Sequence, residues 1–377
     1  MPTFRFIHSS DLHLGRRFST YPEDIRGRLV EARHSAIDAL AAAARDHEAG
    51  DIFIAGDLFD TETPSERVWR QALAAMGAAH ELRWWIIPGN HDSLVAEALW
   101  KRFADEAPES VRIVDEPAPL EVAPGVSLLP SPVPSRFPGR DLTEWMSDCA
   151  TPERHLRIGL AHGGVVTFGS EDDGRETIPI DRARTARLDY LALGDWHGFT
   201  KIADRTFYSG SPERDRFKHQ GRGICLAVTI SGRGTIPQID KVETGRFSWL
   251  ETELHLTPEQ DAAQAFMTAL PASGARRRNT LLRVLGSGWI RLPQREALEI
   301  AKEHASPEFA HFEFVDKELM TECVAEDLDE IAEGGALRVA AEALYEDARR
   351  DGANEFDRRV ADAALSRLYG FVRGQAQ

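Results

Sequence analysis

Cysteine, long apolar runs and internal repeats are all scarce or absent in this sequence of 377 residues. The three cysteines, Cys149, Cys225 and Cys323, are widely separated and odd in number, which argues against a disulfide framework and a thiolate metal site. No run approaches the roughly 18 uninterrupted apolar residues of a membrane span. The first residues lack the charged-then-apolar pattern of a signal peptide. We therefore expect a reduced, cytoplasmic protein that does not span a membrane.

Positive charge is also in short supply. Lysine and arginine together number 45 against 61 acidic residues, which gives a formal net charge of −16. Such an excess repels polyanions and excludes a protein that coats nucleic acid with a uniformly basic surface. It is compatible with a nucleic-acid enzyme, because bound cations and local basic patches set the field that a substrate meets.

Length and composition are those of a globular protein with two domains: 42% of the residues are apolar and 28% are charged. In the first half, helical patterns alternate with short apolar runs typical of buried strands. These runs cover residues 4–7, 52–55, 84–87, 158–161 and 190–193. A helical apolar stripe covers residues 26–48. Thr63, followed by Pro64 and then Glu66, predicts another helix start.

The pattern changes near residue 251. Residues 257–260 predict a helix start, and a strand at 280–285, a helix at 293–304 and a strand at 312–315 follow. Two amphipathic helices then close the chain, with Gly352 between them. We therefore predict a first domain over residues 1–250, a small α+β capping domain over 251–320 and a C-terminal helical segment over 321–377.

Each of the five apolar runs is followed by side chains that can bind a metal. In chain order these are Asp11 and His13; Asp57 and Asp60; Asn90, His91 and Asp92; His162; and Asp195 and His197. Any one of these patterns alone is ordinary turn chemistry. Ligands in layered α/β folds gather beyond the carboxyl ends of strands, so the five tips can converge. The five together indicate a single site.

The side-chain types predict the ions. Aspartate, histidine and asparagine without cysteine suit Mn²⁺, Mg²⁺ or Fe²⁺, with Zn²⁺ as a further candidate. The ligands are too many for one ion and suit two divalent ions about 3.5–4 Å apart, bridged by a carboxylate. Two such ions polarise a bridging water and neutralise phosphate oxygens. The pattern therefore indicates hydrolysis of a phosphate ester.

This set of motifs resembles the calcineurin-like metallophosphoesterase superfamily over about the first 200 residues. The resemblance implies an α/β fold in which two packed mixed β-sheets are flanked by helices. It also implies a ligand set in which one metal is held by Asp11, His13 and His197, the other by Asn90 and His162, and both are bridged by Asp57.

The resemblance further implies that His91 is the general acid that protonates the leaving oxygen, and that Asp60 orients it. Asp92 takes a minor role as a turn or supporting residue. Asp195 departs from the family pattern, which has histidine there. Aspartate can still bind the second metal, but it favours harder ions and makes the bridging water less acidic.

A narrower resemblance is to the SbcD-like DNA repair exonucleases. Residues 6–15, 55–60 with Pro64 and Ser65, and 208–212 carry it, together with a small domain behind the catalytic one. It implies a nuclease that hydrolyses DNA phosphodiester bonds as a DNA-end exonuclease. It also implies a homodimer and an SbcC-type coiled-coil ATPase that docks on the C-terminal helices. Packing of those helices on the capping domain is an equally simple explanation of their apolar stripes.

Contacts with DNA must be local in so acidic a chain. We expect phosphate contacts from Arg17, Arg214, Arg216 and Lys218, which follow metal motifs in the sequence. One alternative keeps the chemistry and changes the substrate to a small nucleotide or a phosphoprotein, although neither requires a capping domain. The other is a non-catalytic scaffold for DNA ends or the ATPase with a weakened second metal site, although metal binding alone does not require His91 and Asp60.

Overall fold

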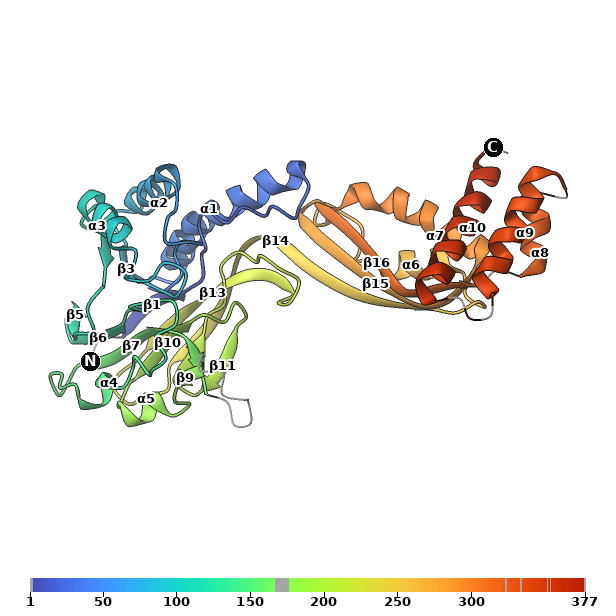
Figure 1. Ribbon diagram of the computed structural model, residues 1–377. Coiled ribbons are helices and arrows are strands. Elements are labelled where there is room, and N and C mark those ends of the chain that lie inside the picture. Colours follow the sequence, from blue (N-terminus) through green and yellow to red (C-terminus); the bar gives the residue numbers. More distant parts are fainter. Residues whose placement is uncertain are drawn as a thin grey trace. The chain divides into compact units, whose positions relative to one another are not determined.

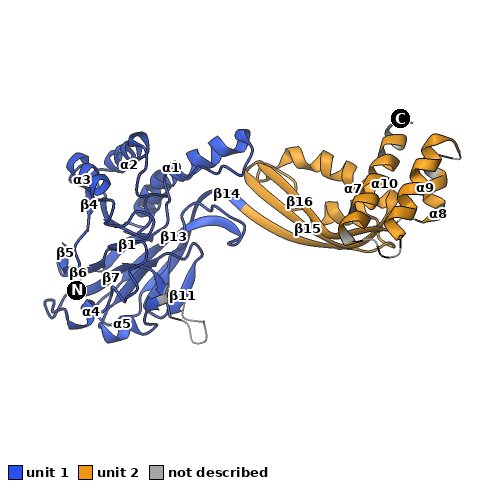
Figure 2. Cartoon of the chain, in the orientation of Figure 1, with its two compact units in different colours: residues 1–248 blue, residues 249–377 orange. Residues whose placement is uncertain are grey.

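The computed structural model describes residues 3–166, 176–322, 324–332, 334–350, 352 and 354–375 (Figure 1). Cys323 lies outside the described residues. The chain forms two compact units, residues 1–248 and 249–377 (Figure 2). The finer division of the second part into a capping domain and a C-terminal segment stays a prediction.

Unit 1 contains two mixed β-sheets. The first has the order β14-β13-β1-β2-β3-β4 within this unit, and its strands are β1 (Phe4–Ser9), β2 (Asp51–Ala55), β3 (Arg83–Ile87), β4 (Val111–Ile113), β13 (Gly221–Ile230) and β14 (Gln238–Leu256), the last of which continues into unit 2. The second has the order β11-β12-β10-β7-β6-β5, and its strands are β5 (Leu120–Ala123), β6 (Val126–Ser131), β7 (Leu156–His162), β10 (Tyr190–Gly194), β11 (Thr200–Ala203) and β12 (Thr206–Tyr208). A short pair, β8 (Gly164–Val165) and β9 (Glu176–Ile178), lies apart from both.

A buried apolar layer joins the two sheets. It includes Phe6 and Phe53 from the first sheet and Leu128, Ile158 and Tyr190 from the second. The other face of the first sheet is covered by α1 (Glu23–Asp46), α2 (Glu66–Ala78) and α3 (Glu97–Glu106), and that of the second by α4 (Trp145–Asp148) and α5 (Arg182–Thr185). The predicted pair of packed mixed sheets flanked by helices is confirmed.

The strand directions decide where the polar residues gather. Strand β1 runs parallel to β2, and β2 runs parallel to β3. In the second sheet β10 runs parallel to β7, with Gly194 opposite His162. All five predicted apolar runs lie in these strands. Their carboxyl ends therefore lie together within each sheet, as the sequence pattern requires.

Two predicted helix starts are wrong. Helix α2 begins after Ser65, not at Thr63, and the Ser65 side chain makes no capping hydrogen bond with the described residues. Helix α6 (Ala262–Ala269) begins after Asp261, whose side chain accepts a hydrogen bond from the Gln264 N–H at 3.0 Å. This cap fixes a later start than residues 257–260 predict.

Unit 2 consists of three strands and a set of helices. Strand β14 continues here, and β15 runs parallel to β16. The remaining elements are β15 (Thr280–Arg291), β16 (His311–Glu322), α6, α7 (Leu292–Ala305), α8 (Ala325–Ile331), α9 (Ala336–Arg349), α10 (Glu355–Gln375) and the 3₁₀ turns Arg277–Asn279 and Ser306–Glu308. Both strands extend well past the predicted 280–285 and 312–315.

Two apolar clusters stabilise unit 2. One joins the strands to α6 and α7 through Leu256, Phe266 and Leu298. The other joins α7 to α8, α9 and α10 and contains Leu328 and Leu365. In the described part of the chain, no helix is both long enough and apolar enough to cross a bilayer.

Candidate metal centre

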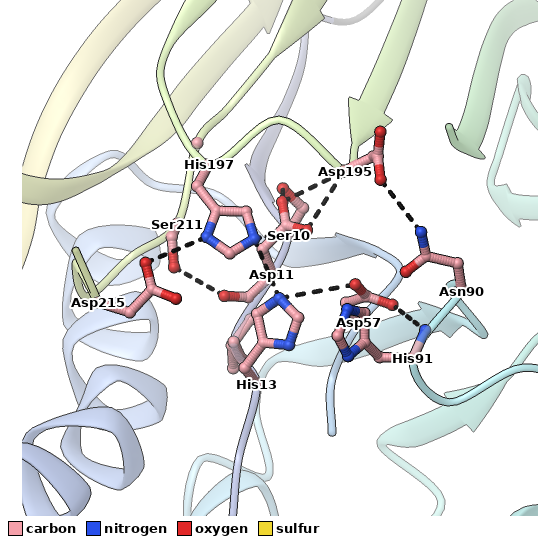
Figure 3. Close-up of polar contacts among 12 residues, drawn as sticks. Ser10, Asp11, His13, Asp57, Asn90, His91, Asp195, His197, Ser211 and Asp215 are labelled. Carbon is pink, nitrogen blue, oxygen red and sulfur yellow. Dashed lines mark hydrogen bonds and ion pairs between the residues drawn. The ribbon is translucent and has the colours of Figure 1, made fainter. Parts of the chain in front are cut away.

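The carboxyl ends of β1, β2, β3, β7 and β10 bring the predicted polar residues together (Figure 3). Three groups have ligand atoms within 4.8 Å of one another: Asp11 with His13 and His197, Asp11 with Asp57 and His162, and His13 with Asp60 and His91. Residues that are far apart in the sequence, from Asp11 to His197, thus surround one centre.

Asp57 lies in the middle of this centre. Its Oδ2 atom is 3.6 Å from His13 Nε2 and 3.5 Å from His162 Nε2. Its Oδ1 atom accepts a hydrogen bond from the His91 N–H at 2.9 Å, which fixes the carboxylate (Figure 3). One oxygen placed between two histidine nitrogens is the arrangement that a bridging ligand needs.

On one side of Asp57, two histidine rings face each other. His13 Nε2 and His197 Nε2 are 3.1 Å apart, and His197 Nε2 is 3.9 Å from Asp11 Oδ1 (Figure 3). Burial lowers the pKa of the His13 imidazole to about 3. The ring is therefore neutral at pH 7 and offers a nitrogen lone pair, which is the form that binds a metal.

On the other side lie His162, Asn90 and Asp195. His162 Nδ1–H donates to the Ala55 carbonyl at 2.8 Å, which leaves the lone pair on Nε2. This Nε2 atom and Asn90 Oδ1 are buried without a hydrogen-bond partner among the described residues. Asp195 Oδ1 is 3.8 Å from His162 Nε2 and accepts from Asn90 Nδ2 at 3.2 Å. Buried acceptors without donors fit a cation.

The charge around His162 supports the same conclusion. Burial by itself disfavours the charged ring, but the carboxylates of Asp57, Asp11 and Asp195 together raise the pKa of His162 to about 9. These carboxylates thus give the centre an excess of negative charge. Divalent ions would compensate it.

Several of the predicted ligands are held in unusual backbone conformations. Asp11, His13, Asp57 and Asp195 have φ angles of 56°, 42°, 54° and 102°, and they are four of the seven non-glycine residues with positive φ in the described part of the chain. Such left-handed conformations cost free energy outside glycine and concentrate at functional sites. The loops after β1, β2 and β10 are therefore shaped for the centre.

Asp11, a predicted ligand, is held by three neighbouring residues. Its carboxylate accepts from Ser10 Oγ at 2.5 Å and from the Asp195 N–H at 3.2 Å. Its main-chain carbonyl accepts from Ser211 Oγ at 2.7 Å (Figure 3). Ser211 lies in the 208–212 segment, so this segment supports the first metal motif directly.

Glycine is required where the loops touch. A Cβ atom on Gly194 would lie 1.9 Å from the Ala55 carbonyl oxygen, and one on Gly89 would lie 2.2 Å from Asp57 Oδ1. Contacts this short force the backbone to move. The strand ends approach so closely only because these positions have no side chain.

Replacing Gly194 by alanine is therefore expected to destabilise the protein by about 1–3 kcal/mol, the range for inserting a methyl group into packed surroundings. Gly27→Ala in α1 is the matched control, since its Cβ would meet no described atom within 4 Å. That change should stabilise by about 0.5–1 kcal/mol, the helix preference for alanine. Urea unfolding of the metal-free protein measures the change in unfolding free energy for both variants. Equal changes for Gly194→Ala and Gly27→Ala would contradict the packing argument.

Asp92 has a larger structural role than the sequence suggests. It is fully buried, and its two carboxylate oxygens accept from the Phe59 N–H at 2.9 Å and the Gly89 N–H at 2.7 Å. It therefore ties the loop after β2 to the loop after β3. Burial raises the pKa of Asp92 to about 6.

Asp215 and Arg33 support the centre and were not predicted. Asp215 Oδ1 is 3.3 Å from His197 Nδ1, and Asp215 Oδ2 is 3.5 Å from Arg33 Nη2. The buried Arg33 also donates to the Leu12 carbonyl. Burial alone would raise the pKa of Asp215, but its contact with His197 and the charge of Arg33 lower that pKa far below its usual range. The sequence did contain one sign of this role: Arg33 is a charged residue on the apolar stripe of residues 26–48, where a buried arginine needs a partner.

His91 contacts Asp60 through the main chain of Asp60. His91 Nδ1–H donates to the main-chain carbonyl of Asp60 at 3.0 Å. The Asp60 carboxylate lies instead 3.4 Å from both His13 Nδ1 and Arg16 Nη1, which attract it. The histidine is thus oriented by backbone, and the carboxylate faces the first metal position.

The predicted DNA contacts divide into buried and more accessible side chains. Arg214 is buried and donates to the His197 carbonyl, and its contact with a phosphate stays a prediction. Arg17, Arg216 and Lys218 are exposed. Arg216 pairs with Asp215 at 3.1 Å, and Lys218 Nζ lies 4.4 Å from the Trp196 ring centroid.

Comparison with known proteins assigns the family. The family described as calcineurin-like phosphoesterase matches residues 4–199. The chain belongs to this family. As a member it is a metal-dependent phosphoesterase, a hydrolase whose divalent ions fit the cluster around Asp57.

Two curated relatives come from Bacillus subtilis (strain 168). The chain is 33% identical over 243 residues to the uncharacterized metallophosphoesterase YhaO, covering 60% of this chain and 58% of that protein. It is 32% identical over 266 residues to the D subunit of nuclease SbcCD, covering 60% and 65%. The match thus spans less than two thirds of either relative. The crystal structure of TT1561 of Thermus thermophilus aligns with a TM-score of 0.40 and 12% identity, covering 63% of this chain and 99% of that one.

Proposed function

We propose that this phosphoesterase is a two-metal phosphodiesterase that hydrolyses DNA phosphodiester bonds, as a DNA-end exonuclease in DNA repair. The observation that carries the proposal is the position of Asp57 Oδ2 between His13 Nε2 and His162 Nε2, at 3.6 and 3.5 Å. The choice of DNA is supported by the 32% identity to the D subunit of nuclease SbcCD.

The ligand sets follow from the two sides of Asp57. One ion is assigned to Asp11, His13 and His197, the other to Asn90, His162 and Asp195, with Asp57 shared. Paired divalent ions supply an activated water and neutralise the phosphate oxygens. We propose Mn²⁺ as the native ion, with Mg²⁺ or Fe²⁺ as alternatives, because the ligands are oxygen and imidazole nitrogen without sulfur.

His91 is assigned as the general acid. Because its Nδ1–H is held by the Asp60 carbonyl at 3.0 Å, Nε2 of the protonated ring can deliver a proton to the leaving oxygen. Asp60 thus positions His91 through its main chain. The Asp60 carboxylate, 3.4 Å from His13 Nδ1, positions a metal ligand instead.

The cationic side of the centre suits a nucleic-acid backbone. A cavity of about 700 Å³ is lined by Arg16, Arg17 and Arg216 and by the carboxylates of Asp60 and Asp215, with which Arg16 and Arg216 are paired. Guanidinium groups bind phosphates bidentately and position a strand without reading its sequence. We propose that Arg17, Arg216 and Lys218 contact the phosphates of bound DNA. Such contacts allow an acidic chain to bind a polyanion locally.

The C-terminal helices are the proposed contact for an SbcC-type ATPase. Val339 on α9 and Phe356 and Phe371 on α10 are exposed apolar side chains, although α9 and α10 also pack on each other. Homodimer formation is a further proposal drawn from the resemblance alone. Association of the full chain with a coiled-coil ATPase would test the first, and its mass in solution would test the second.

The substrate is tested by offering the Mn²⁺-loaded full chain end-labelled duplex DNA and, separately, cyclic nucleotides and a phosphopeptide. Shortening of the duplex from its ends supports the proposal. Hydrolysis of cyclic nucleotides or of the phosphopeptide, with the duplex left intact, would assign the same centre to a different substrate. No hydrolysis of any of these substrates would leave a non-catalytic scaffold.

Asp215→Asn is expected to weaken binding of one of two Mn²⁺ ions by about 10–100-fold, the range for losing a partner of a metal-ligating histidine. The carboxylate touches His197 Nδ1 at 3.3 Å, and asparagine has the same shape without the charge. Titration with Mn²⁺, followed by its electron paramagnetic resonance signal, counts the two sites. Asp204→Asn, which changes an exposed aspartate paired with Lys201, is the matched control. Two unchanged sites in Asp215→Asn would contradict the expectation.

A further inference from the structure

A second cavity, of about 400 Å³, borders the metal centre beside the ligands assigned to the second ion. Asn90, His162 and Asp195, which are those ligands, line one wall together with His91, the assigned acid. Arg136 and Phe137 line another wall. The cavity therefore adjoins the place where a phosphate bound at the centre would lie.

The loop that carries Arg136 and Phe137 is fixed to the metal centre. The Val133 N–H donates to the Pro88 carbonyl at 3.1 Å, and the Leu94 N–H donates to the Val133 carbonyl at 2.9 Å. These two bonds bracket the segment that contains Asn90 and His91. The start of the loop is thus held against the segment that supplies a metal ligand and the acid.

The far end of the loop is fixed as well. Ser131 Oγ donates to the Leu142 carbonyl at 2.9 Å and closes the loop on itself. The buried Arg182 donates to Thr143 Oγ1 at 3.0 Å and to Ser147 Oγ at 2.6 Å, where the loop leads into α4. Residues 132–141 therefore form a closed loop with anchored ends, a construction common in binding loops.

This anchored loop presents an aromatic side chain to solvent. Phe137 is 69% exposed, and the Arg136 guanidinium lies 5.8 Å from its ring centroid. Folding gains little from a phenylalanine left in water. An aromatic ring with a neighbouring cation at a cavity mouth does provide a stacking surface for a nucleobase, whatever its sequence.

We propose that this cavity receives the nucleoside attached to the scissile phosphate, with its base stacked on Phe137 and its phosphate side near Arg136. The proposal rests on the proposed phosphodiesterase function and adds the place and the residues that would recognise the nucleoside next to the reacting phosphorus. A volume of about 400 Å³ lies within the range of small-ligand sites. The arginine-lined cavity remains for the rest of the strand.

The test compares two diesters of the same leaving group on the Mn²⁺-loaded full chain: the p-nitrophenyl ester of thymidine 5′-phosphate, or of thymidine 3′-phosphate, and methyl p-nitrophenyl phosphate. The measured quantity is the ratio of kcat/KM for the nucleoside ester to that for the methyl ester. We expect a ratio of about 10–100 with at least one thymidine isomer, as stacking of one base supplies. In Phe137→Ala this ratio should fall close to one.

Ile236→Ala is the matched control, because Ile236 is a comparably exposed apolar residue, at 67%, in the connection between β13 and β14. It should keep the wild-type ratio. A wild-type ratio near one for both isomers would overturn the proposal. So would a Phe137→Ala variant in which both esters lose the same factor, since that result describes a loop needed only for stability.

Binding separates this inference from the proposed function. If neither ester is hydrolysed, the phosphodiesterase assignment fails, and calorimetry with thymidine monophosphate and inorganic phosphate still tests the cavity. The nucleotide should bind the Mn²⁺-loaded protein about 10–100-fold more tightly than phosphate, and Phe137→Ala should remove this difference. Equal affinities in the wild-type protein would overturn the proposal whatever the activity.

Discussion

His91→Ala is expected to slow hydrolysis of an unactivated phosphodiester by about 10²–10⁴-fold, the contribution of a positioned general acid, while two metal ions stay bound. The side chain of His91 is held by the Asp60 carbonyl, and the main-chain N–H of His91, not its ring, donates to Asp57. The ring can therefore be removed without removing an assigned metal ligand. The rate of dinucleotide hydrolysis measures the loss of catalysis, and the Mn²⁺ content of the purified variant shows whether both ions stay bound.

Substrates with different leaving groups distinguish a general acid from a residue that only supports the structure. An alkoxide needs a proton to depart, whereas a nitrophenolate does not, so the loss should be much smaller on a nitrophenyl diester than on a dinucleotide. His80→Ala is the control, because the His80 side chain is 86% exposed and has no assigned role. Equal losses on both substrates would remove His91 from the acid role, and unchanged cleavage would remove it from the mechanism.

Asp57→Asn is expected to abolish tight binding of both ions and to lower activity by more than about 100-fold. Mutating a residue that only contacts a metal ligand already lowers metal affinity or activity by about 10–100-fold. Asp57 Oδ2 lies close to histidines of both ligand sets. Burial, with Asp92 and Asp11 nearby, raises the pKa of Asp57 well above its usual range despite the opposing effect of His162. The neutral amide should therefore stabilise the metal-free protein while it destroys the site.

Thermal unfolding in a chelator measures the expected gain in metal-free stability, and thermal unfolding in excess Mn²⁺ measures the expected loss of metal binding. The wild-type protein should gain stability with the metal, because ligands that bind only the folded state stabilise it. Asp57→Asn should melt at a higher temperature than wild type in the chelator and show no metal-dependent gain. Asp105→Asn, an exposed position in α3, should behave as wild type. A metal-dependent gain retained in Asp57→Asn would contradict the bridging role.

The sheets and the residues of the centre could be predicted from the sequence because both depend on local patterns. Runs such as 52–55 and 190–193 are buried strands, and glycines such as Gly56 and Gly194 allow the polar residues after them to turn inward. Parallel strand direction then brings the strand ends together. The packing of two mixed sheets and the division of the ligands between two ions were implied by the family resemblance, not by these local patterns.

The residues that support the centre depend on tertiary contacts and could not be predicted in this way. Arg214, Asp215 and Arg216 are consecutive, yet the first two are buried against the His197 loop and the third is exposed. A run of charges does not reveal which members face inward. In the same way, no sequence pattern indicated that hydrogen bonds through Val133 hold the loop around Phe137 beside Asn90.

The residues assigned as ligands come from both β-sheets, with Asp11 and Asp57 following strands of the first and His162 and Asp195 belonging to the second. Ions bound among them would cross-link the two halves of the sandwich without a covalent bond. Separating the sheets would then require release of the ions. Metal supply would in that case set the cooperativity of unit 1 as well as its chemistry, and without the ions unit 1 would open more readily along its central apolar layer.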